Sequence, residues 1–459
     1  MRAHPIAASV LVLLAPLAAA QSMPTTEEII WPETGTFAAY PAERLDGRIW
    51  RPFVYGALHW DDNIFRLSSS ANTQAILGTS DRSDMVRRLG AGIRADIPIS
   101  LQRVVLEASI EDNHFDTFDR LDYVGHRLTG IWRWQVGRQL SGDAGGTTRK
   151  VLGGYGDLAT GTRNLVTENR GFASAGYMVT PRWRVRGAVD ASDVEHSDPA
   201  RAVLETRTAS TTLGVDYMTP GASSVGGQVR YTSGESPNQQ LVGGTLINND
   251  YDQTETSLVA RWVLTAKTAL DGRIGYTRRE HEQLPGRDYN GATGRLRFDW
   301  GATPKTHLNV SAWREVQPFQ TLLSTVIVAP PAAGSLGAAQ GTFAGPGTPP
   351  AEVVTAEGVA SYVIARGYSI GPVWAPTEKI VVQARLLEEK QDFQGDPGIT
   401  LAVNPRREDT YRAWGLSVGY APLRALQLAL AFQSGKRTSN VAGRDYDFDS
   451  VTLSGRFSF

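Results

Sequence analysis

The sequence predicts an all-β fold: a transmembrane, up-and-down antiparallel β-barrel of about 18 strands, with 16 as the alternative count. Three observations predict it. Many segments alternate apolar and polar side chains, short proline turns alternate with long loops, and the N-terminal segment is typical of secreted proteins. No later run of 18 or more apolar residues exists, so no helix is expected to cross the membrane.

Residues 1–20 are predicted to be a signal peptide, because a short apolar run is followed by the small residues Ala18 and Ala20. The alternative, an N-terminal membrane anchor, needs about 20 apolar residues, and this run is shorter. Residues 21–47 are rich in proline and not strand-like, so we expect a periplasmic or plugging arm. Residues 48–459 are predicted to form the barrel.

The predicted strands share one pattern, in which apolar residues occupy one parity and small or polar residues the other. Trp414, Leu416, Val418 and Tyr420 are an example, and their parity is free of charge. A lipid-facing arginine at the bilayer midplane costs roughly 2–4 kcal/mol, which explains this exclusion. We expect strands near 48–60, 85–97, 101–111, 121–133, 138–148, 166–179, 182–192, 204–218, 222–233, 251–265, 268–280, 288–301, 305–316, 352–374, 379–390, 408–420, 424–436 and 444–459.

The connections between these strands are of two kinds. An aromatic residue, Thr or Ala, and then Pro recur before a strand, as in "YMVTPRWRVRG" (177–187) and "WGATPKTHLNV" (300–310). Proline suits tight turns because it cannot donate to a strand ladder. Long polar or Gly/Pro-rich segments separate these turns. Short turns on one side and long loops on the other predict a barrel in the outer membrane of a Gram-negative bacterium, with aromatic residues at the periplasmic border.

The last nine residues, "VTLSGRFSF", continue the alternation to the end of the sequence. Phe457 and Phe459 lie on the apolar parity and resemble the terminal signal that the barrel assembly machinery reads. Besides that machinery, the expected partners are outer-membrane lipid and lipopolysaccharide. The formal net charge of −1 argues against a nucleic-acid partner.

Arginine dominates the parity that is predicted to face the lumen. On the clearer strands twelve arginines and six acids occupy it, and a barrel of 16–18 strands is wide enough for an aqueous channel. Such a wall would favour anions, including acidic sugar polymers. The alternative is that these arginines only pair with acids of the same wall. The pore-lining candidates are Arg94, Arg103, Arg182, Arg184, Arg186, Arg261, Arg273, Arg295, Arg297 and Arg385.

The segment "HWDDNIFRLSSS" (59–70) follows the first strand and contains Asp61, Asp62 and Asn63. These oxygens could bind calcium together with Asp112 and Asn113, but they lack the ligand spacing of an EF-hand. We therefore expect a solvated loop. No metal site and no cofactor is predicted, and no catalytic fingerprint appears, so an enzyme is not expected.

The stretch "GRIWRPFVYGALHWDDNIFRL" (47–67), the repeated proline turns and the terminal Phe resemble the EpsL family of outer-membrane barrels. Its sharpest part is Asp61, Asp62, Asn63 and Arg66. That family is associated with exosortase-type exopolysaccharide biosynthesis, so the resemblance implies export of an extracellular polysaccharide and partners from its biosynthesis and export machinery. Two rival functions remain: a general or anion-selective porin, and an outer-membrane enzyme.

Overall fold

The computed structural model describes residues 49–459 apart from residues 157–160, 222, 243–244, 284–286, 319–361 and 395–406. The predicted signal peptide and N-terminal arm lie outside the described residues and stay predictions. Among the residues it describes, no helix is long and apolar enough to cross a membrane.

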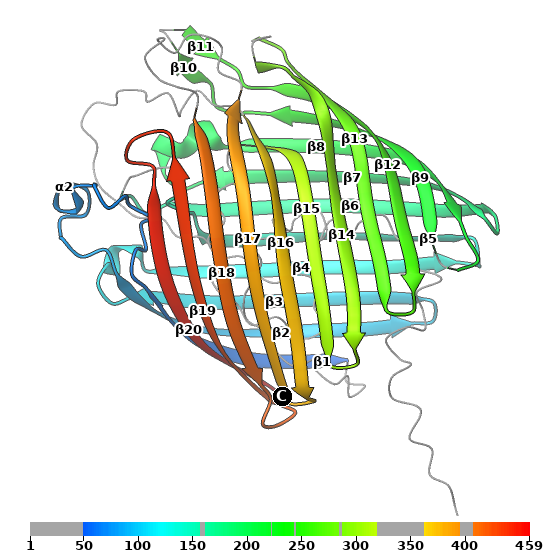
Figure 1. Cartoon of the computed structure of the whole chain (residues 1–459), viewed down its shortest axis with the longest axis horizontal. Helices are drawn as coiled ribbons and strands as arrows, with labels where there is room; N and C mark the ends of the chain where they lie inside the picture. The colour runs from blue at the N-terminus through cyan, green and yellow to red at the C-terminus, as the bar shows by residue number, and fades with distance from the viewer. Residues whose placement is uncertain are drawn as a thin grey trace, which may run out of the picture.

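The described strands close into one antiparallel barrel of 18 strands, as the sequence predicts (Figure 1). Each barrel strand pairs with its sequence neighbours, and β1 pairs with β20 to close the ring. The barrel strands are β1 (Trp50–Asp61), β2 (Asp84–Ile99), β3 (Gln102–Phe115), β4 (Tyr123–Val136), β5 (Leu140–Leu152), β6 (Leu165–Thr180), β7 (Trp183–His196), β8 (Thr206–Met218), β9 (Ser224–Glu235), β12 (Tyr251–Thr265), β13 (Thr268–His281), β14 (Tyr289–Thr303), β15 (Thr306–Pro318), β16 (Tyr362–Thr377), β17 (Ile380–Gln394), β18 (Glu408–Tyr420), β19 (Leu426–Ser439) and β20 (Tyr446–Ser458).

Some elements lie outside the barrel wall, all between strands at the long-loop end. The hairpin of β10 (Gln240–Val242) and β11 (Thr245–Ile247) stands between β9 and β12, and the sequence did not predict it. Among the described residues, a short helix, α2 (Thr73–Leu77), follows β1, and the 3-10 helices η2 (Asp119–Leu121) and η3 (Pro199–Leu204) precede β4 and β8.

The two faces of the wall follow the predicted parity. On β1, Phe53 and Tyr55 point inward and are buried, whereas Val54 and Leu58 point outward and are 41% and 47% exposed. Exposed leucine, valine and aromatic side chains recur on the outward parity of the other strands. An apolar outer surface and a polar inner surface are the reverse of a soluble barrel, so the fold is that of an outer-membrane barrel.

Aromatic residues on either side of the short turns lie on the outward face of the barrel. Trp183 packs edge-on against Tyr217 of the neighbouring strand, with ring centroids 5.3 Å apart. Trp262, Trp300, Trp374 and Tyr420 are exposed at the same end of their own strands. This border corresponds to the aromatic belt that the sequence predicts at the short-turn end.

At the long-loop end, connections beside β1 to β6 pack into an apolar cluster. Phe65 is its centre and contacts Phe118 and Tyr155 edge-on, with ring centroids 4.6 and 4.5 Å apart. Ile64, Leu67 and other buried residues complete it. These connections therefore have a packed apolar core of their own and are not simply solvent-exposed loops.

The orientation of the two ends can be tested because the chain has no cysteine of its own. Ala75→Cys in the loop after β1 should react with a membrane-impermeant maleimide on intact cells. Leu423→Cys in the short turn before β19 should react only after the outer membrane is opened. Labelling of Leu423→Cys, but not Ala75→Cys, on intact cells would reverse the predicted orientation.

The chain end belongs to the closing seam. The Phe459 backbone N–H donates to the Pro52 carbonyl at 2.9 Å, and the Phe457 and Phe459 rings pack edge-on at 5.0 Å. Deleting Phe459 should lower the amount of heat-modifiable barrel in the outer membrane, because it removes a seam hydrogen bond and an exposed terminal aromatic. Phe459→Tyr, which keeps both, is the control. Equal assembly of the deletion and the wild type at native expression would contradict the assembly role.

Candidate functional site

The inner wall of the barrel carries the predicted arginines. Arg94, Arg103, Arg184, Arg186, Arg261, Arg273, Arg295, Arg297 and Arg385 all lie on the inward parity of their strands. Arg182 is the exception. It lies in the short turn before β7, where the alternation has ended, and donates to the phenol oxygen of the border residue Tyr217 at 3.2 Å.

Most of these arginines pair with carboxylates of the same wall. Arg103 donates to Asp96 at 2.7 Å, Arg94 to Glu107 at 3.2 Å, and Arg261 to Asp271 at 3.2 Å. Arg297 lies 3.0 Å from Asp299. The inner wall therefore contains many ion pairs. This agrees with the alternative interpretation of the sequence, in which individual arginines pair with acids of the same wall.

One part of the wall holds more arginines than acids. On β7, Arg184 and Arg186 both bind Asp216 of β8, at 2.7 and 3.0 Å. Beside them, Arg170 of β6 and Arg230 of β9 both approach Asp190, at 3.7 and 2.9 Å. We call the six residues Arg170, Arg184, Arg186, Arg230, Asp190 and Asp216 the β6–β9 arginine cluster. It contains four cations and two carboxylates, and the third inward carboxylate of these strands, Glu168 on β6, is paired with Arg149 of β5.

Local sequence makes room for this cluster. Gly214 faces Arg186 across the strands, and a Cβ at Gly214 would lie 3.0 Å from the Arg186 Cζ atom. The guanidinium therefore lies close against the backbone of β8, and a larger residue at position 214 would have to push it aside. This position fixes Arg186 against Asp216.

A second group, on β12 to β15, is balanced. Arg273 binds Glu315 at 2.9 Å and Glu255 at 3.4 Å, and Arg295 binds Glu315 at 2.6 Å. Two arginines thus alternate with two glutamates.

Several inward carboxylates did not enter the sequence count, which covered only the clearer strands. They could have been found from the same parity rule, because each shares the inward face with arginines of neighbouring strands. They are Glu111, Asp143, Glu168, Asp216, Glu255 and Glu315, and each lies within 4.0 Å of an arginine nitrogen. The same rule also adds inward arginines that did not enter the count, among them Arg133, Arg149, Arg170 and Arg230, so the added charges largely form further ion pairs.

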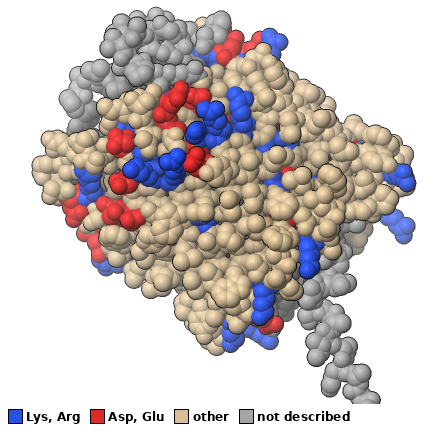
Figure 2. Space-filling model, viewed as in Figure 1, with Lys and Arg blue, Asp and Glu red and all other residues tan. Residues whose placement is uncertain are grey.

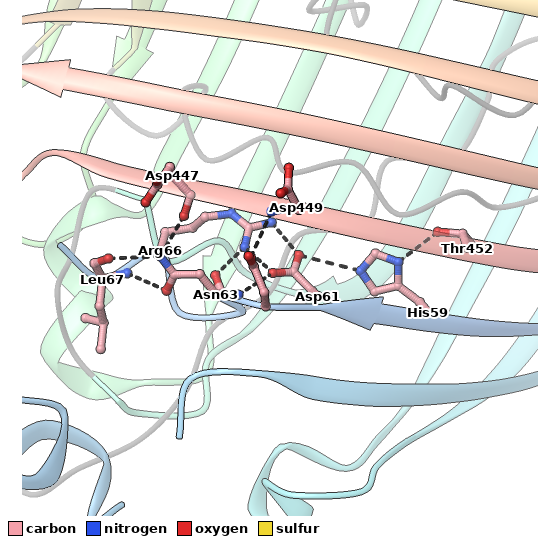
Figure 3. Close-up of polar contacts among 9 residues, drawn as sticks. His59, Asp61, Asn63, Arg66, Leu67, Asp447, Asp449 and Thr452 are labelled. Carbon is pink, nitrogen blue, oxygen red and sulfur yellow. Dashed lines mark hydrogen bonds and ion pairs between the residues drawn. The ribbon is translucent and has the colours of Figure 1, made fainter. Parts of the chain in front are cut away.

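A different site lies at the seam, where β1 ends beside β20 (Figure 3). Arg66 donates from both terminal nitrogens to the two carboxylate oxygens of Asp61, each at 2.7 Å. The guanidinium also lies over the Phe448 ring of β20, 3.6 Å from its centroid. Asp61 is fully buried and Arg66 nearly so. Burial alone would lower the pKa of Arg66, but the Asp61 carboxylate outweighs it and raises the pKa above its ordinary value.

The neighbours of this pair bind the last strand directly. The Asn63 side chain donates to the carbonyls of Leu67 and Asp447, at 2.9 and 2.8 Å, and accepts from the Leu67 N–H. The Asp62 carboxylate accepts the Asp449 N–H at 2.8 Å. One step down the seam, His59 and Thr452 share a 2.8 Å hydrogen bond. We call Asp61, Asp62, Asn63 and Arg66 the seam clasp, because they join the first strand to the last. Figure 3 labels Asp61, Asn63 and Arg66.

The seam clasp corrects the expectation of a solvated loop. Asp61, Asn63 and Arg66 are buried, because their polar atoms find partners within the clasp and on β20. The structure also does not bring together the oxygen atoms that the alternative of a calcium site requires. Asp112 and Asn113 lie on β3, which β2 separates from β1, and Asn113 accepts from Arg88 at 2.8 Å. No metal-binding group of His, Cys, Asp or Glu occurs among the described residues.

No family model and no curated protein matches the chain. Solved structures of outer-membrane proteins are similar to it at low identity. OpdK of Pseudomonas aeruginosa is 9% identical, with 89% of this chain and 99% of that chain covered and a TM-score of 0.43. OccAB3 of Acinetobacter baumannii is 9% identical over 90% and 100%, with a TM-score of 0.43. OccK9 (OpdG) of P. aeruginosa is 12% identical over 90% and 99%, with a TM-score of 0.45.

Proposed function

We propose that this protein is a porin-like channel that lets small hydrophilic solutes cross the outer membrane. The main support for this proposal is the contrast between the charged inner face and the apolar outer face of the barrel wall. Ionised side chains line the inner face of most barrel strands, and apolar side chains dominate the outer face. An 18-stranded barrel has room for water in its lumen, and paired charges on its wall need that water or each other for solvation.

The wall also supports a preference for anions. The β6–β9 arginine cluster has two more cations than carboxylates, and it covers four adjacent strands on one side of the lumen. An uncompensated positive charge raises the local concentration of anions and lowers that of cations. Small carboxylates, including sugar acids, are the solute class that fits.

Export of a polysaccharide, which the resemblance to the EpsL family implies, stays a prediction. The most specific residues of that resemblance form the seam clasp, and the buried side chains of Asp61, Asn63 and Arg66 support a role in closing the barrel rather than in touching a polymer. The porin alternative therefore has more support from the geometry.

Reconstitution of the purified full-length protein tests the proposal. In planar bilayers we expect steps of ionic current, and in liposome swelling we expect a hexuronate to enter faster than the neutral hexose of similar size. A large dextran should not enter. Absence of both current and swelling, with protein that migrates as a folded barrel, would refute a diffusion channel.

A further inference from the structure

The outer face of the barrel carries an unusual row of cations. Arg314, Arg366, Lys390, Arg412 and Lys436 lie on five consecutive strands, β15 to β19, and all point outward and are exposed. We call these five residues the outer cation row. In Figure 2, Lys, Arg, Asp and Glu side chains gather over the long-loop half of this face, above a broad band of other residues.

The strand register places like charges side by side. Arg366 stands directly opposite both Arg314 and Lys390, and Arg412 stands opposite Lys436. Like charges directly opposite each other in a sheet are destabilising. A row of them on neighbouring strands therefore needs a compensating anion.

Carboxylates of the chain compensate the row only in part. Arg412 binds Glu388 at 2.8 Å, and Arg314 donates to the Tyr289 phenol oxygen at 3.1 Å. Within the described part of the chain, Arg366, Lys390 and Lys436 make no ion pair within 4.0 Å. Asp447 stands opposite Lys436 on β20, and Asp392 and Glu408 lie two to four residues nearer the loops. The middle of the row is left positive.

The height of the row fits the headgroups of the outer leaflet. Arg366 lies eight residues from the border residue Trp374, and Arg412 lies eight residues from Tyr420. Eight residues of a tilted strand rise about 20 Å, close to the height of the apolar band of such barrels. Tyr368 and Trp414, two residues nearer the turns, are exposed aromatics.

The row is a local feature of β15 to β19. Eight residues from the border aromatics of five other strands, the outward position is uncharged. These positions are Asn169 on β6, Ala191 on β7, Ala209 on β8, Thr254 on β12 and Ala292 on β14. On β13 the outward position opposite Thr254 is Arg278, which is paired with Glu280, so what is particular to β15–β19 is the unbroken run of cations.

We propose that the outer cation row binds the phosphate groups of a phosphorylated glycolipid of the outer leaflet, lipopolysaccharide. Phosphate offers several anionic oxygens, and arginine and lysine are its usual partners in proteins. A lipid delivers these phosphates at the height of the row, while its acyl chains cover the apolar stripe of the same strands. The proposal rests on the membrane-facing surface and is independent of what passes through the lumen.

A charge-matched pair of variants tests it. The row variant is Arg366→Gln, Lys390→Gln and Lys436→Gln. The control variant is Arg87→Gln, Arg207→Gln and Arg278→Gln, which also removes three exposed, outward cations near the loops. Each of these control cations already has a carboxylate partner, Asp116, Asp193 and Glu280 respectively.

Each purified, folded protein is incubated with lipopolysaccharide in detergent, and the glycolipid that co-purifies is measured. We expect the row variant to retain at least fivefold less than the wild type, and the control variant to stay within twofold of it. Dephosphorylated lipopolysaccharide should bind the wild type at least fivefold less, and millimolar inorganic phosphate should not displace the intact glycolipid. If the row variant does not fold, the proposal is decided by the two measurements on the wild-type protein, with dephosphorylated lipopolysaccharide and with inorganic phosphate.

Equal retention by the row and control variants, or equal binding of phosphorylated and dephosphorylated glycolipid, would overturn the proposal. Displacement by inorganic phosphate would overturn the lipid as the source. Channel conductance of the row variant should equal that of the wild type. The lipopolysaccharide proposal can therefore be refuted without refuting the porin-like channel, and the reverse also holds.

Discussion

Replacing Arg66 by Gln should lower the amount of assembled barrel several-fold and destabilise the remainder by about 3–5 kcal/mol, the usual cost of breaking a buried ion pair. Asp61 is fully buried, and both of its carboxylate oxygens accept from Arg66. Glutamine cannot neutralise that charge or stack on Phe448 as a guanidinium does. Urea unfolding of the protein in lipid vesicles, followed by tryptophan fluorescence, measures the change.

The matched control is Arg87→Gln, which breaks the ion pair with Asp116 at 2.6 Å. Both members of that pair are substantially exposed, so the expected loss is about 0–1 kcal/mol. The double variant Asp61→Asn with Arg66→Gln should recover part of the loss, because no uncompensated charge remains buried. Equal stability of Arg66→Gln and Arg87→Gln would show that the clasp does not hold the seam.

The sequence predicts the barrel wall well because the relevant information is local. Alternation of side chains, proline turns and an uncharged apolar parity can each be read within one strand and its turn. The loop segments lack such a period. The hairpin of β10 and β11 and the apolar cluster around Phe65 were accordingly not predicted.

The seam clasp was misread for a related reason. Asn63 and Asp447 are 384 residues apart, and Asp62 and Asp449 are 387 apart. Polar residues at the end of a strand look solvated until barrel closure brings the last strand beside the first. Only the closed ring supplies their partners.

Parity identifies the lumen arginines but not their partners. Arg184 could pair with Asp190 of its own strand, but the register places Asp216 of β8 directly opposite it. Cross-strand neighbours lie closer than residues six apart on one strand. The outer cation row was not predicted, because its five residues become neighbours only through the register of β15 to β19.

The double variant Arg184→Gln and Arg186→Gln should shift the ion selectivity of the channel towards cations by roughly fivefold in permeability ratio. A unit charge about 8 Å from a permeating ion contributes roughly 0.5 kcal/mol in water, and salt at 0.1 M screens about half of this. Two lost charges then change the local concentrations of anions and cations by roughly twofold each, in opposite directions. The reversal potential in a salt gradient across a planar bilayer measures the ratio.

Two further variants separate charge from structure. The triple variant that adds Asp216→Asn removes one net charge instead of two, so it should give about half the shift in free energy. It also leaves no buried carboxylate without its arginines, and should therefore assemble better than the double variant. The second is the outward double variant Arg87→Gln and Arg207→Gln, which removes the same charge from the outer face and should leave the reversal potential unchanged. If the inward and outward double variants gave the same reversal potential, the β6–β9 arginine cluster would be a structural part of the wall, and the anion preference would have to come from elsewhere in the lumen.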